Sequence, residues 1–498
     1  MRIRIIGTGV MGRGIAQWAA TAGHTVELAD ARPEAVGEAI GFVGDMFGRA
    51  VQKGRMSGAE AEAALDRLVP LDSVAARGDE VELVIEAVRE DLDTKAELFA
   101  SLERALPPTT MFATNTSSLP VTRIAATLAD PARLAGLHFF NPVPLMKIVE
   151  VVPGAATRPD IPVTLAELVR ASGHRAVVVA DTPGFLVNHA GRGLVTEALA
   201  LLEDSVAAPA EIDRIARDVL GLRMGPFELM DLTGLDVTAA VIDSIWAGFR
   251  HSDRLRPSFL TPNRVAAGLF GRKTGQGFYD HRPGAEPPSE PPVTGDAARP
   301  VWIAGTGPDA DALRAALPQA VREPGSRAVV LVATWGAAVS AAVAAHRLPA
   351  ERTVGVDPLS LSTRRPVLAA TPASDPVAVA DARAVLASGS GAVSVVRDTH
   401  GSVAQRLLAS IVSVAASIAE RSLATPADID LAVATALGYP TGPLAWGDRV
   451  GTRRLLELQT RLHDGTGDPR YRPTRWLRER AELGLPLTTP AYPLESQP

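Results

Sequence analysis

The sequence predicts an α/β domain with a mainly parallel sheet, then a helical domain, and then a second pair of the same two kinds. Three observations predict this order. Short β-rich runs alternate with helical patterns near the start of the chain, which is typical of parallel sheets covered by helices on both faces. Apolar residues then recur at helical spacing. Finally, a segment late in the chain repeats an earlier one.

The composition is that of a folded protein with several domains. At 498 residues the chain is too long for one hydrophobic core, so we expect about two to four domains. A net charge of -6 predicts neither a nucleic-acid nor a membrane partner, because both select concentrated positive charge. Cysteine is absent, which excludes disulfides and thiolate metal sites, and we expect no metal.

The start of the chain predicts a cytoplasmic protein. Met1 is followed by "RIRII", without the apolar core of a secretion signal. No later apolar run is expected to reach the length that spans a bilayer.

We expect the first domain at residues 1–182 and the helical one at residues 183–282. The β-rich runs of the first domain are "IRIIG", "TVELAD", "ELVIEAV", "MFATN", "LAGLHFF", "KIVEVV" and "RAVVVAD". The pattern changes at "DTPGFLVN", after which helical spacing dominates.

A Pro-rich polar segment follows, and we interpret residues 283–299 as a linker. Beyond it, "VWIAG", "RAVVLVA" and "TVGVD" alternate with alanine-rich helical patterns, which predicts another α/β domain at residues 300–397. Helical patterns return at residues 398–485, and residues 486–498 form a tail.

The second helical domain repeats the first. "TPADIDLAVATALGYPTGPLAWGDRVG" matches "APAEIDRIARDVLGLRMGPFELMDLTG" without a gap. The aligned residues are Pro426 with Pro209, Asp430 with Asp213, Pro443 with Pro226, Asp448 with Asp231, and Gly451 with Gly234. A repeat of this size indicates one structural unit used twice. The chain is therefore predicted to be a two-domain module followed by a diverged second copy.

A glycine-rich segment after the first predicted strand indicates a dinucleotide site. Gly7, Gly9 and Gly12 have the G-x-G-x-x-G spacing between a strand and a helix. This spacing allows a tight turn, the approach of a pyrophosphate, and the packing of helix on strand. Asp30 ends the next strand, where a carboxylate binds ribose hydroxyls and repels a 2′-phosphate, so NAD is favoured over NADP. The alternative is a turn that serves packing only, with Asp30 as a helix cap.

The second α/β domain contains a weaker version of this spacing. Gly305, Gly307 and Ala310 occupy the three positions. Pro308 removes an amide that would bind phosphate, and no acidic residue ends the next strand. We interpret this segment as a structural remnant.

One histidine and one glutamate lie in strand-like runs on either side of "NPVP". The prolines at 142 and 144 cannot continue a central strand, so the chain must turn there. If it reverses, His138 and Glu150 face each other. A carboxylate bound to one imidazole nitrogen fixes the tautomer and stabilises the imidazolium that forms when the other nitrogen takes a proton. The alternative is a core histidine beside a nearby acid.

Polar residues near this pair suit a substrate site. "MFATNTSSLP" places Ser117 just beyond the carboxyl end of a strand, where open α/β sheets bind ligands. Asn141 follows His138 by three residues, and Asn188 opens the helical domain. Ser117 and Asn188 could hold a substrate oxygen and the nicotinamide amide in a reactive geometry. Alternatively, they are a helix N-cap and a buried amide.

The ordered set of motifs resembles the L-3-hydroxyacyl-CoA dehydrogenases. It comprises "GTGVMGRGIA", "EAVRED", "TNTSSLP", "HFFNPVPLMKIVEV", "DTPGFLVN", "GPFELMDLTGLD" and "GRKTGQGFYD". The second half resembles the longer bacterial members, which append a degenerate Rossmann-like domain and a second all-α domain to the Rossmann-like NAD-binding domain and its all-α partner. These members include 3-hydroxybutyryl-CoA and 3-hydroxyadipyl-CoA dehydrogenases. The resemblance implies reversible, NAD-dependent oxidation of an L-3-hydroxyacyl-CoA to the 3-oxoacyl-CoA.

The resemblance also implies roles for individual residues. His138 would be the base, with Glu150 as its partner, Ser117 and Asn188 orienting the substrate, and Asn141 supporting the site. The residues implied to contact NAD are Gly7, Gly9, Val10, Met11, Gly12, Asp30, Glu90, Lys95, Asn115 and Ser117. Lys53 would meet the phosphates of CoA, although a solvated basic helix explains Lys53 equally well.

Two other functions stay open from the sequence. A dehydrogenase of free hydroxy acids shares the glycine motif, but such enzymes use a helical-domain lysine and residues 151–270 contain none. A catalytically silent NAD-binding scaffold would have lost polar site residues, which this chain keeps.

The second copy is not expected to be a second active site. Gln405 occupies the place of Asn188, and we expect no counterpart of the hairpin that carries His138 and Glu150. His189 stands where the family usually has arginine. Because shorter members pair through their helical domains, the chain is expected to be a homodimer or a monomer in which the second copy substitutes for a partner.

Overall fold

The computed structural model describes residues 1–491 and divides into two compact units. The first unit comprises residues 1–188 together with residues 423–437, and the second comprises residues 189–422 and the described residues from 438 onward. A short segment of the second helical repeat therefore belongs to the same unit as the N-terminal domain.

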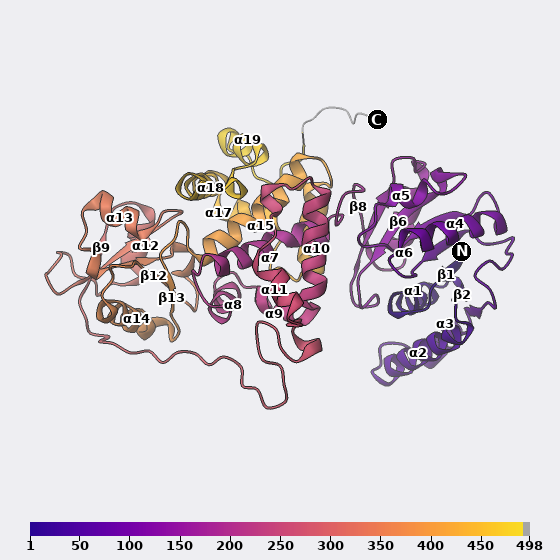
Figure 1. Ribbon diagram of the computed structural model, residues 1–498, viewed down its shortest axis with the longest axis horizontal. Coiled ribbons are helices and arrows are strands. Elements are labelled where there is room, and N and C mark those ends of the chain that lie inside the picture. Colours follow the sequence, from indigo (N-terminus) through magenta and orange to yellow (C-terminus); the bar gives the residue numbers. More distant parts are fainter. Residues whose placement is uncertain (492–498) are drawn as a thin grey trace. The chain divides into compact units, whose positions relative to one another are not determined.

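The first unit is built on an eight-stranded sheet with the order β3-β2-β1-β4-β5-β6-β7-β8 (Figure 1). The strands are β1 (Arg2–Ile6), β2 (Thr25–Ala29), β3 (Leu68–Pro70), β4 (Leu83–Glu86), β5 (Met111–Thr114), β6 (Leu134–Phe139), β7 (Ile148–Pro153) and β8 (Arg175–Val178). All neighbours are parallel except β6 and β7. The sequence did not predict β3, a short strand at one edge.

Helices cover this sheet and complete its core. They are α1 (Val10–Thr21), α2 (Pro33–Gln52), α3 (Gly58–Leu65), α4 (Leu92–Ala105), α5 (Val121–Ala125) and α6 (Asp160–Ala171), with a 3-10 turn, η1 (Pro131–Arg133), between α5 and α6. Buried apolar residues of α1, α2 and α6 share one hydrophobic cluster with the strands. In that cluster the ring of Trp18 packs edge-on against Phe139, at 4.8 Å between centroids. The segment 423–437 contributes α16 (Pro426–Ala436), which packs beside β7 and β8.

The second unit contains the rest of both helical repeats. The first repeat supplies α7 (Val187–Glu203), whose first two residues belong to the first unit, together with α8 (Pro209–Asp218), α9 (Pro226–Thr233), α10 (Leu235–Gly248), η2 (Asp253–Leu255), α11 (Leu260–Ala266) and η3 (Arg272–Thr274). The second repeat supplies α15 (Val403–Glu420), α17 (Pro443–Val450), α18 (Thr452–Thr466), η6 (Pro469–Tyr471) and α19 (Arg475–Leu483). The helical periodicity in both repeats is therefore confirmed.

The second unit also contains a five-stranded sheet with the order β13-β12-β11-β10-β9. The strands are β9 (Val301–Ala304), β10 (Val329–Ala333), β11 (Thr353–Val356), β12 (Val367–Ala370) and β13 (Ser394–Arg397). The helical elements between them are α12 (Pro308–Ala316), α13 (Val339–His346), η4 (Ala350–Arg352), η5 (Pro358–Ser360) and α14 (Pro376–Ser390). Residues of α12 and α14 form its core with the strands.

This sheet corrects two expectations from the sequence. β11 and β12 are antiparallel, and the backbone N–H of Asp357 donates to the carbonyl of Val367 at 3.0 Å. A counterpart of the β6–β7 pair therefore exists, with other side chains in place of His138 and Glu150. The Gly305 segment follows β9, which is an edge strand, whereas Gly7 follows the central strand β1. The two glycine segments thus occupy different places in their sheets.

One helix of residues 1–491, α15, is long and apolar enough to cross a membrane by length and composition. The expectation that no segment reaches this length was therefore wrong, although 89% of that segment is buried inside the protein.

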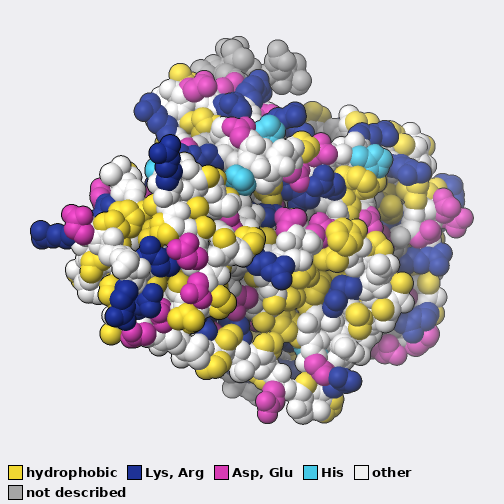
Figure 2. Space-filling view, turned by 60° about the vertical axis from the view of Figure 1, so that its left-hand side comes forward, with side chains coloured by type: hydrophobic (Ala, Val, Ile, Leu, Met, Phe, Trp, Pro, Cys, Tyr) yellow, Lys and Arg dark blue, Asp and Glu magenta, His cyan; other side chains and the backbone are white. Residues whose placement is uncertain are grey.

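On the face drawn in Figure 2, cationic and anionic side chains are interspersed.

Candidate active site

The β6–β7 pair brings His138 and Glu150 together as the reversal of the chain predicts. The two residues are direct partners in the antiparallel register, and Nδ1 of His138 lies 2.6 Å from Oε2 of Glu150. Both side chains are buried. Because Nδ1 is engaged by the carboxylate, Nε2 is the ring nitrogen left to exchange a proton with a substrate.

The second oxygen of Glu150 fixes the start of α7. Oε1 accepts the backbone N–H of Leu186 at 3.0 Å and that of Val187 at 2.8 Å. A carboxylate at the N-terminus of a helix is stabilised by unpaired amides and by the helix dipole. Asn188 is the next residue of this helix, so Glu150 ties its position to that of the imidazole.

Aromatic rings surround the imidazole. The ring centroid of His138 lies 4.5 Å from that of Phe140 and 5.7 Å from that of Phe185. Phe185 has a φ of +48°, in the left-handed region that side chains rarely adopt. Strain of this kind persists where surrounding structure enforces it, often at functional sites. Neither phenylalanine was expected from the sequence to belong to the site, although both lie in the family-like motifs "HFFNPVPLMKIVEV" and "DTPGFLVN".

The glycine loop has the geometry that a dinucleotide requires. Gly7 has a φ of +91°, and a Cβ there would meet the carbonyl oxygen of Ala87 at 2.6 Å. A Cβ on Gly12 would lie 1.7 Å from the carbonyl oxygen of Gly7, so helix and loop pack without room for a side chain. At Gly9, which caps α1, a Cβ would meet no protein atom within 4 Å. The backbone at Gly9 can therefore be approached closely, as a pyrophosphate on a helix N-terminus needs.

Asp30 is held beside this loop at the end of β2. Its Oδ2 accepts the backbone N–H of Thr8 at 2.7 Å, and Oδ1 accepts that of Arg32 at 3.0 Å. Burial alone would raise the pKa of Asp30, but the hydrogen bonds from Thr8 and Arg32 outweigh it and lower the pKa. The group is therefore a carboxylate at neutral pH, as the recognition of ribose hydroxyls requires.

Lys95 and Glu90, which are also implied to contact NAD, belong to a polar network that joins a buried lysine to a partly exposed glutamate. Lys95 is 1% exposed and lies 2.5 Å from Glu86 and 3.3 Å from Glu90. Glu90 in turn accepts the Thr116 hydroxyl at 2.6 Å and the Ser117 N–H at 2.9 Å. This network orders the loop after β5. Glu86 was missed from the sequence, although its place at the carboxyl end of β4 is a signal for a functional acid.

The remaining predicted residues lie in different settings. Asn115 accepts the backbone N–H of Phe139 at 2.8 Å and so links the ends of β5 and β6. Ser117 and Asn141 are exposed, beyond the ends of β5 and β6 respectively. Val10 and Met11 form the first turn of α1. Lys53 is exposed at the C-terminal end of α2, and none of its described contacts joins it to the other site residues.

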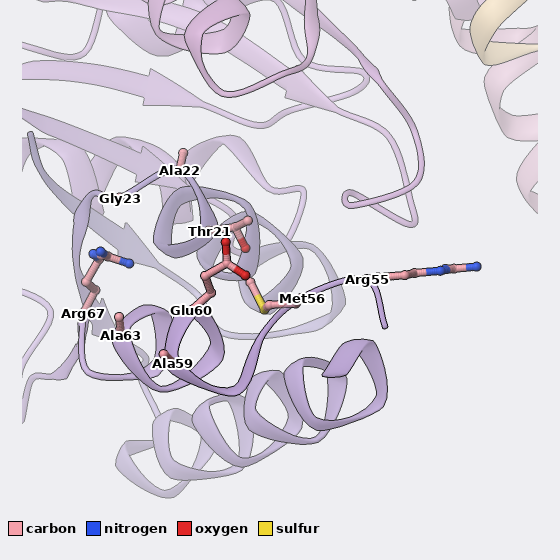
Figure 3. A pocket seen from close by; sticks show the side chains of 9 residues that line it. All are labelled: Thr21, Ala22, Gly23, Arg55, Met56, Ala59, Glu60, Ala63 and Arg67. Carbon is pink, nitrogen blue, oxygen red and sulfur yellow. The ribbon is translucent and has the colours of Figure 1, made fainter. Parts of the chain in front are cut away.

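A cavity of about 550 Å³ in the first unit does not belong to the candidate active site. It is found where α1 ends and α3 passes, whereas the glycine loop precedes α1 (Figure 3). Its lining residues are Thr21, Ala22, Gly23, Arg55, Met56, Ala59, Glu60, Ala63 and Arg67. In Figure 3 the Arg55 side chain points away from the others. None of the predicted site residues lines this cavity.

Comparisons with known proteins agree with this geometry. Residues 2–182 match the family model of the 3-hydroxyacyl-CoA dehydrogenase NAD-binding domain, and residues 184–281 and 401–489 match that of the C-terminal domain. The chain belongs to the 3-hydroxyacyl-CoA dehydrogenase family. It is an NAD-dependent oxidoreductase that acts on 3-hydroxyacyl-CoA.

Relatives of this dehydrogenase are of two lengths. The chain is 37% identical to a 3-hydroxyadipyl-CoA dehydrogenase of Escherichia coli over 97% of both proteins. A crystal structure of 3-hydroxybutyryl-CoA dehydrogenase from Escherichia coli matches with a TM-score of 0.86 and 36% identity, over 97% of this chain and 98% of that one. A probable 3-hydroxybutyryl-CoA dehydrogenase of Bacillus subtilis is 37% identical over 56% of this chain and 97% of its own length. The first copy thus corresponds to nearly the whole of a shorter relative.

Proposed function

We propose that this enzyme oxidises an L-3-hydroxyacyl-CoA reversibly through His138 as general base. The observation that carries this proposal is the contact of 2.6 Å between Nδ1 of His138 and Oε2 of Glu150. Nε2 takes the proton of the C3 hydroxyl during oxidation and returns it during reduction, while Glu150 stabilises the imidazolium. NAD bound at the glycine loop supplies the acceptor for the hydride that leaves C3.

Ser117, Asn188 and Asn141 are proposed to position the substrate. The polar network through Glu90 holds Ser117, and the first turn of α7 holds Asn188 next to the amides that Glu150 binds. Small errors in such positions are costly, because reacting atoms must start within about 3–3.5 Å of each other. We also propose that Lys53, at an exposed helix end, meets the phosphates of CoA.

The acyl chain is proposed to be that of 3-hydroxybutyryl-CoA or 3-hydroxyadipyl-CoA, as the names of the long relatives suggest. The test is NADH formation from each thioester, in both stereoisomers, with free 3-hydroxybutyrate as a control. We expect turnover of the L-thioesters only. Equal turnover of the free acid would contradict the proposal, and NADH binding without any turnover would favour a silent scaffold.

We infer that the five-stranded sheet is the remainder of a second NAD-binding domain. Its strands match β4–β8 in order, and the antiparallel pair lies at the same place in both sheets. Asp181 accepts the backbone N–H groups of Val121 and Thr122, and Asp398 accepts those of Val339 and Ser340 in the same way. Counterparts of β1–β3, and with them the glycine loop, are absent from the described part of this domain.

This correspondence places Asp357 at the position of His138 and Val367 at that of Glu150. Trp335 takes the place of Ser117 and is 3% exposed, and its Nε1 donates to the carbonyl of Arg454 at 3.0 Å. A buried indole thus fills the place of the substrate hydroxyl partner. We therefore propose that the second copy is structural, with domains at residues 300–397 and 398–485 after a linker at 283–299.

We further propose that the two copies form an internal pseudo-dimer, so that the chain is a monomer of 52.1 kDa in solution. Light scattering after size exclusion measures this mass directly. A stable dimer of twice the mass would show that the second copy does not replace a partner chain.

A further inference from the structure

The helices α7 and α15 contact each other within the second unit. A Cβ on Gly193 would lie 2.8 Å from Cα of Ile411, so the two backbones approach closely there. The repeat has a constant spacing of 217 residues, as from Pro209 to Pro426. By this spacing Gly193 corresponds to Ser410, the neighbour of Ile411. The helices therefore touch at nearly equivalent points.

Two backbone hydrogen bonds show that the copies are related reciprocally. In the first unit, Ala180 N–H donates to the carbonyl of Leu423 at 2.9 Å. In the second unit, Arg397 N–H donates to the carbonyl of Val206 at 2.9 Å. The spacing of 217 residues converts one bond into the other with the copies exchanged. This exchange is the property of a two-fold relationship between like partners.

The two-fold relationship gives each place along the contact of α7 with α15 an equivalent place in which the copies are exchanged. One such pair of places differs in charge. At one of them, Nε of Arg406 lies 2.6 Å from Oε1 of Glu197, with Glu197 fully buried and Arg406 only 2% exposed. The Tyr471 hydroxyl donates to the same oxygen at 2.7 Å, and Arg470 lies 3.6 Å from the other. This buried cluster combines Glu197 of the first copy with three residues of the second.

At the other place the same positions carry no ion pair. His189 corresponds to Arg406, and Val414 corresponds to Glu197. The His189 ring packs against Phe249 at 4.4 Å between centroids, and Val414 is fully buried. Burial, with the nearby charges of Arg421 and Arg192, lowers the pKa of His189 to about 3. The imidazole is therefore neutral at physiological pH.

We propose that the Glu197–Arg406 pair, together with its uncharged counterpart His189–Val414, specifies pairing of the first copy with the second within one chain and disfavours pairing of like copies. This inference rests on the internal pseudo-dimer proposed above. Two first copies would bury Glu197 twice, each time with a neutral histidine in the place of Arg406. Two second copies would bury Arg406 twice, each time opposite a valine. A buried charge without its partner is strongly destabilising, whereas in the mixed pair Glu197 and Arg406 neutralise each other.

The first experiment tests whether residues 189 and 414 face each other in the full chain. His189→Arg buries a charge opposite Val414, so the melting temperature falls. Val414→Glu added to it creates a second ion pair, so the melting temperature recovers, whereas Val414→Gln serves as the uncharged control. Recovery with glutamate but not with glutamine supports the inference. A fall with no recovery in the double variant overturns it.

The second experiment measures the choice of partner. A protease site between the exposed residues Gly284 and Ala285 is cleaved after folding, and the fragments are unfolded in urea and refolded together. Native mass spectrometry then counts the complexes. We expect one N-terminal fragment paired with one C-terminal fragment. His189→Arg should raise the ratio of N-terminal homodimers to mixed pairs at least about tenfold, which is about 1.4 kcal/mol.

The outcomes of this experiment separate the two proposals. Homodimers as abundant as mixed pairs in the unchanged sequence overturn the role of the ion pair but leave the pseudo-dimer intact. Fragments that fold without associating overturn the pseudo-dimer, and the inference with it.

Discussion

The carboxylate of Glu150 lies 2.6 Å from Nδ1 of His138, and the two residues are direct partners across β6 and β7. The same carboxylate binds the first amides of α7 with its other oxygen. One buried group therefore orients the imidazole and anchors the helix that carries Asn188. Substitution of Glu150 should alter the orientation and tautomer of the imidazole, whereas substitution of His138 removes the imidazole itself. The two substitutions therefore test the orientation of the base and its presence separately.

His138→Gln should lower kcat by about 10² to 10⁴ because the general base is lost. NADH affinity should stay within about twofold, since none of the described contacts of His138 involves the glycine loop. Steady-state kinetics and NADH fluorescence titration measure the two quantities. His346→Gln, at an exposed helix end, is the matched control. Full activity in His138→Gln would remove the histidine from the reaction.

Glu150→Gln should also lower kcat, by at least about 10³, although the imidazole remains. A glutamine that accepts the amides of Leu186 and Val187 with its oxygen turns its NH₂ group toward His138. Nδ1 must then accept, so Nε2 carries the hydrogen and cannot take a proton. NMR of the imidazole nitrogens reports the tautomer directly. Unchanged turnover with the tautomer reversed would show that Nε2 is not the base.

Gly9→Ala and Gly12→Ala should fail in different ways. A Cβ at Gly9 meets no protein atom within 4 Å, so the variant should keep its melting temperature and lose at least about tenfold in NADH affinity. A Cβ at Gly12 collides with the carbonyl of Gly7, which should cost about 1–3 kcal/mol of stability. Thermal unfolding and NADH titration compare the pair. Normal NADH binding by Gly9→Ala would place the pyrophosphate elsewhere.

Glu90 should make part of the stability depend on pH. Burial raises the pKa of Glu90, but hydrogen bonds from Thr116 and Ser117 and the charge of Lys95 outweigh it, and the pKa lies below its ordinary value of 4.5. A carboxylate with a lowered folded-state pKa stabilises the fold above the unfolded pKa, and this contribution disappears as the pH falls through the folded pKa. Glu90→Gln should therefore cost more stability at pH 7 than at about pH 3.

Urea unfolding at the two pH values checks this prediction, with Glu97→Gln as the control because Glu97 is an exposed glutamate on the helix that follows Glu90, α4. A loss of stability in Glu90→Gln that is equal at both pH values would mean that the carboxylate charge contributes nothing.

Local patterns predicted much of the first unit. The glycine spacing between β1 and α1 requires only a strand, a turn and a helix that are adjacent along the chain. The facing of His138 and Glu150 follows from a short reversal, because side chains alternate along strands and the turn sets the register. The roles of these residues in catalysis stay predictions until the variants are measured.

The sequence by itself determined the order of α/β and helical segments, the repeat, the dinucleotide loop and the hairpin pair, because each depends on residues close together in the chain. Only the tertiary structure decided that Lys95 lies between Glu86 and Glu90, that Phe185 packs on His138, and that Arg406 pairs with Glu197. The contacts of Phe185 and Arg406 join residues far apart in sequence, and Lys95 meets its two partners only through the folding of the segment between β4 and α4. A buried charge finds its partner only when packing excludes water from both. Composition and periodicity record which side chains are buried, but not which of them meet.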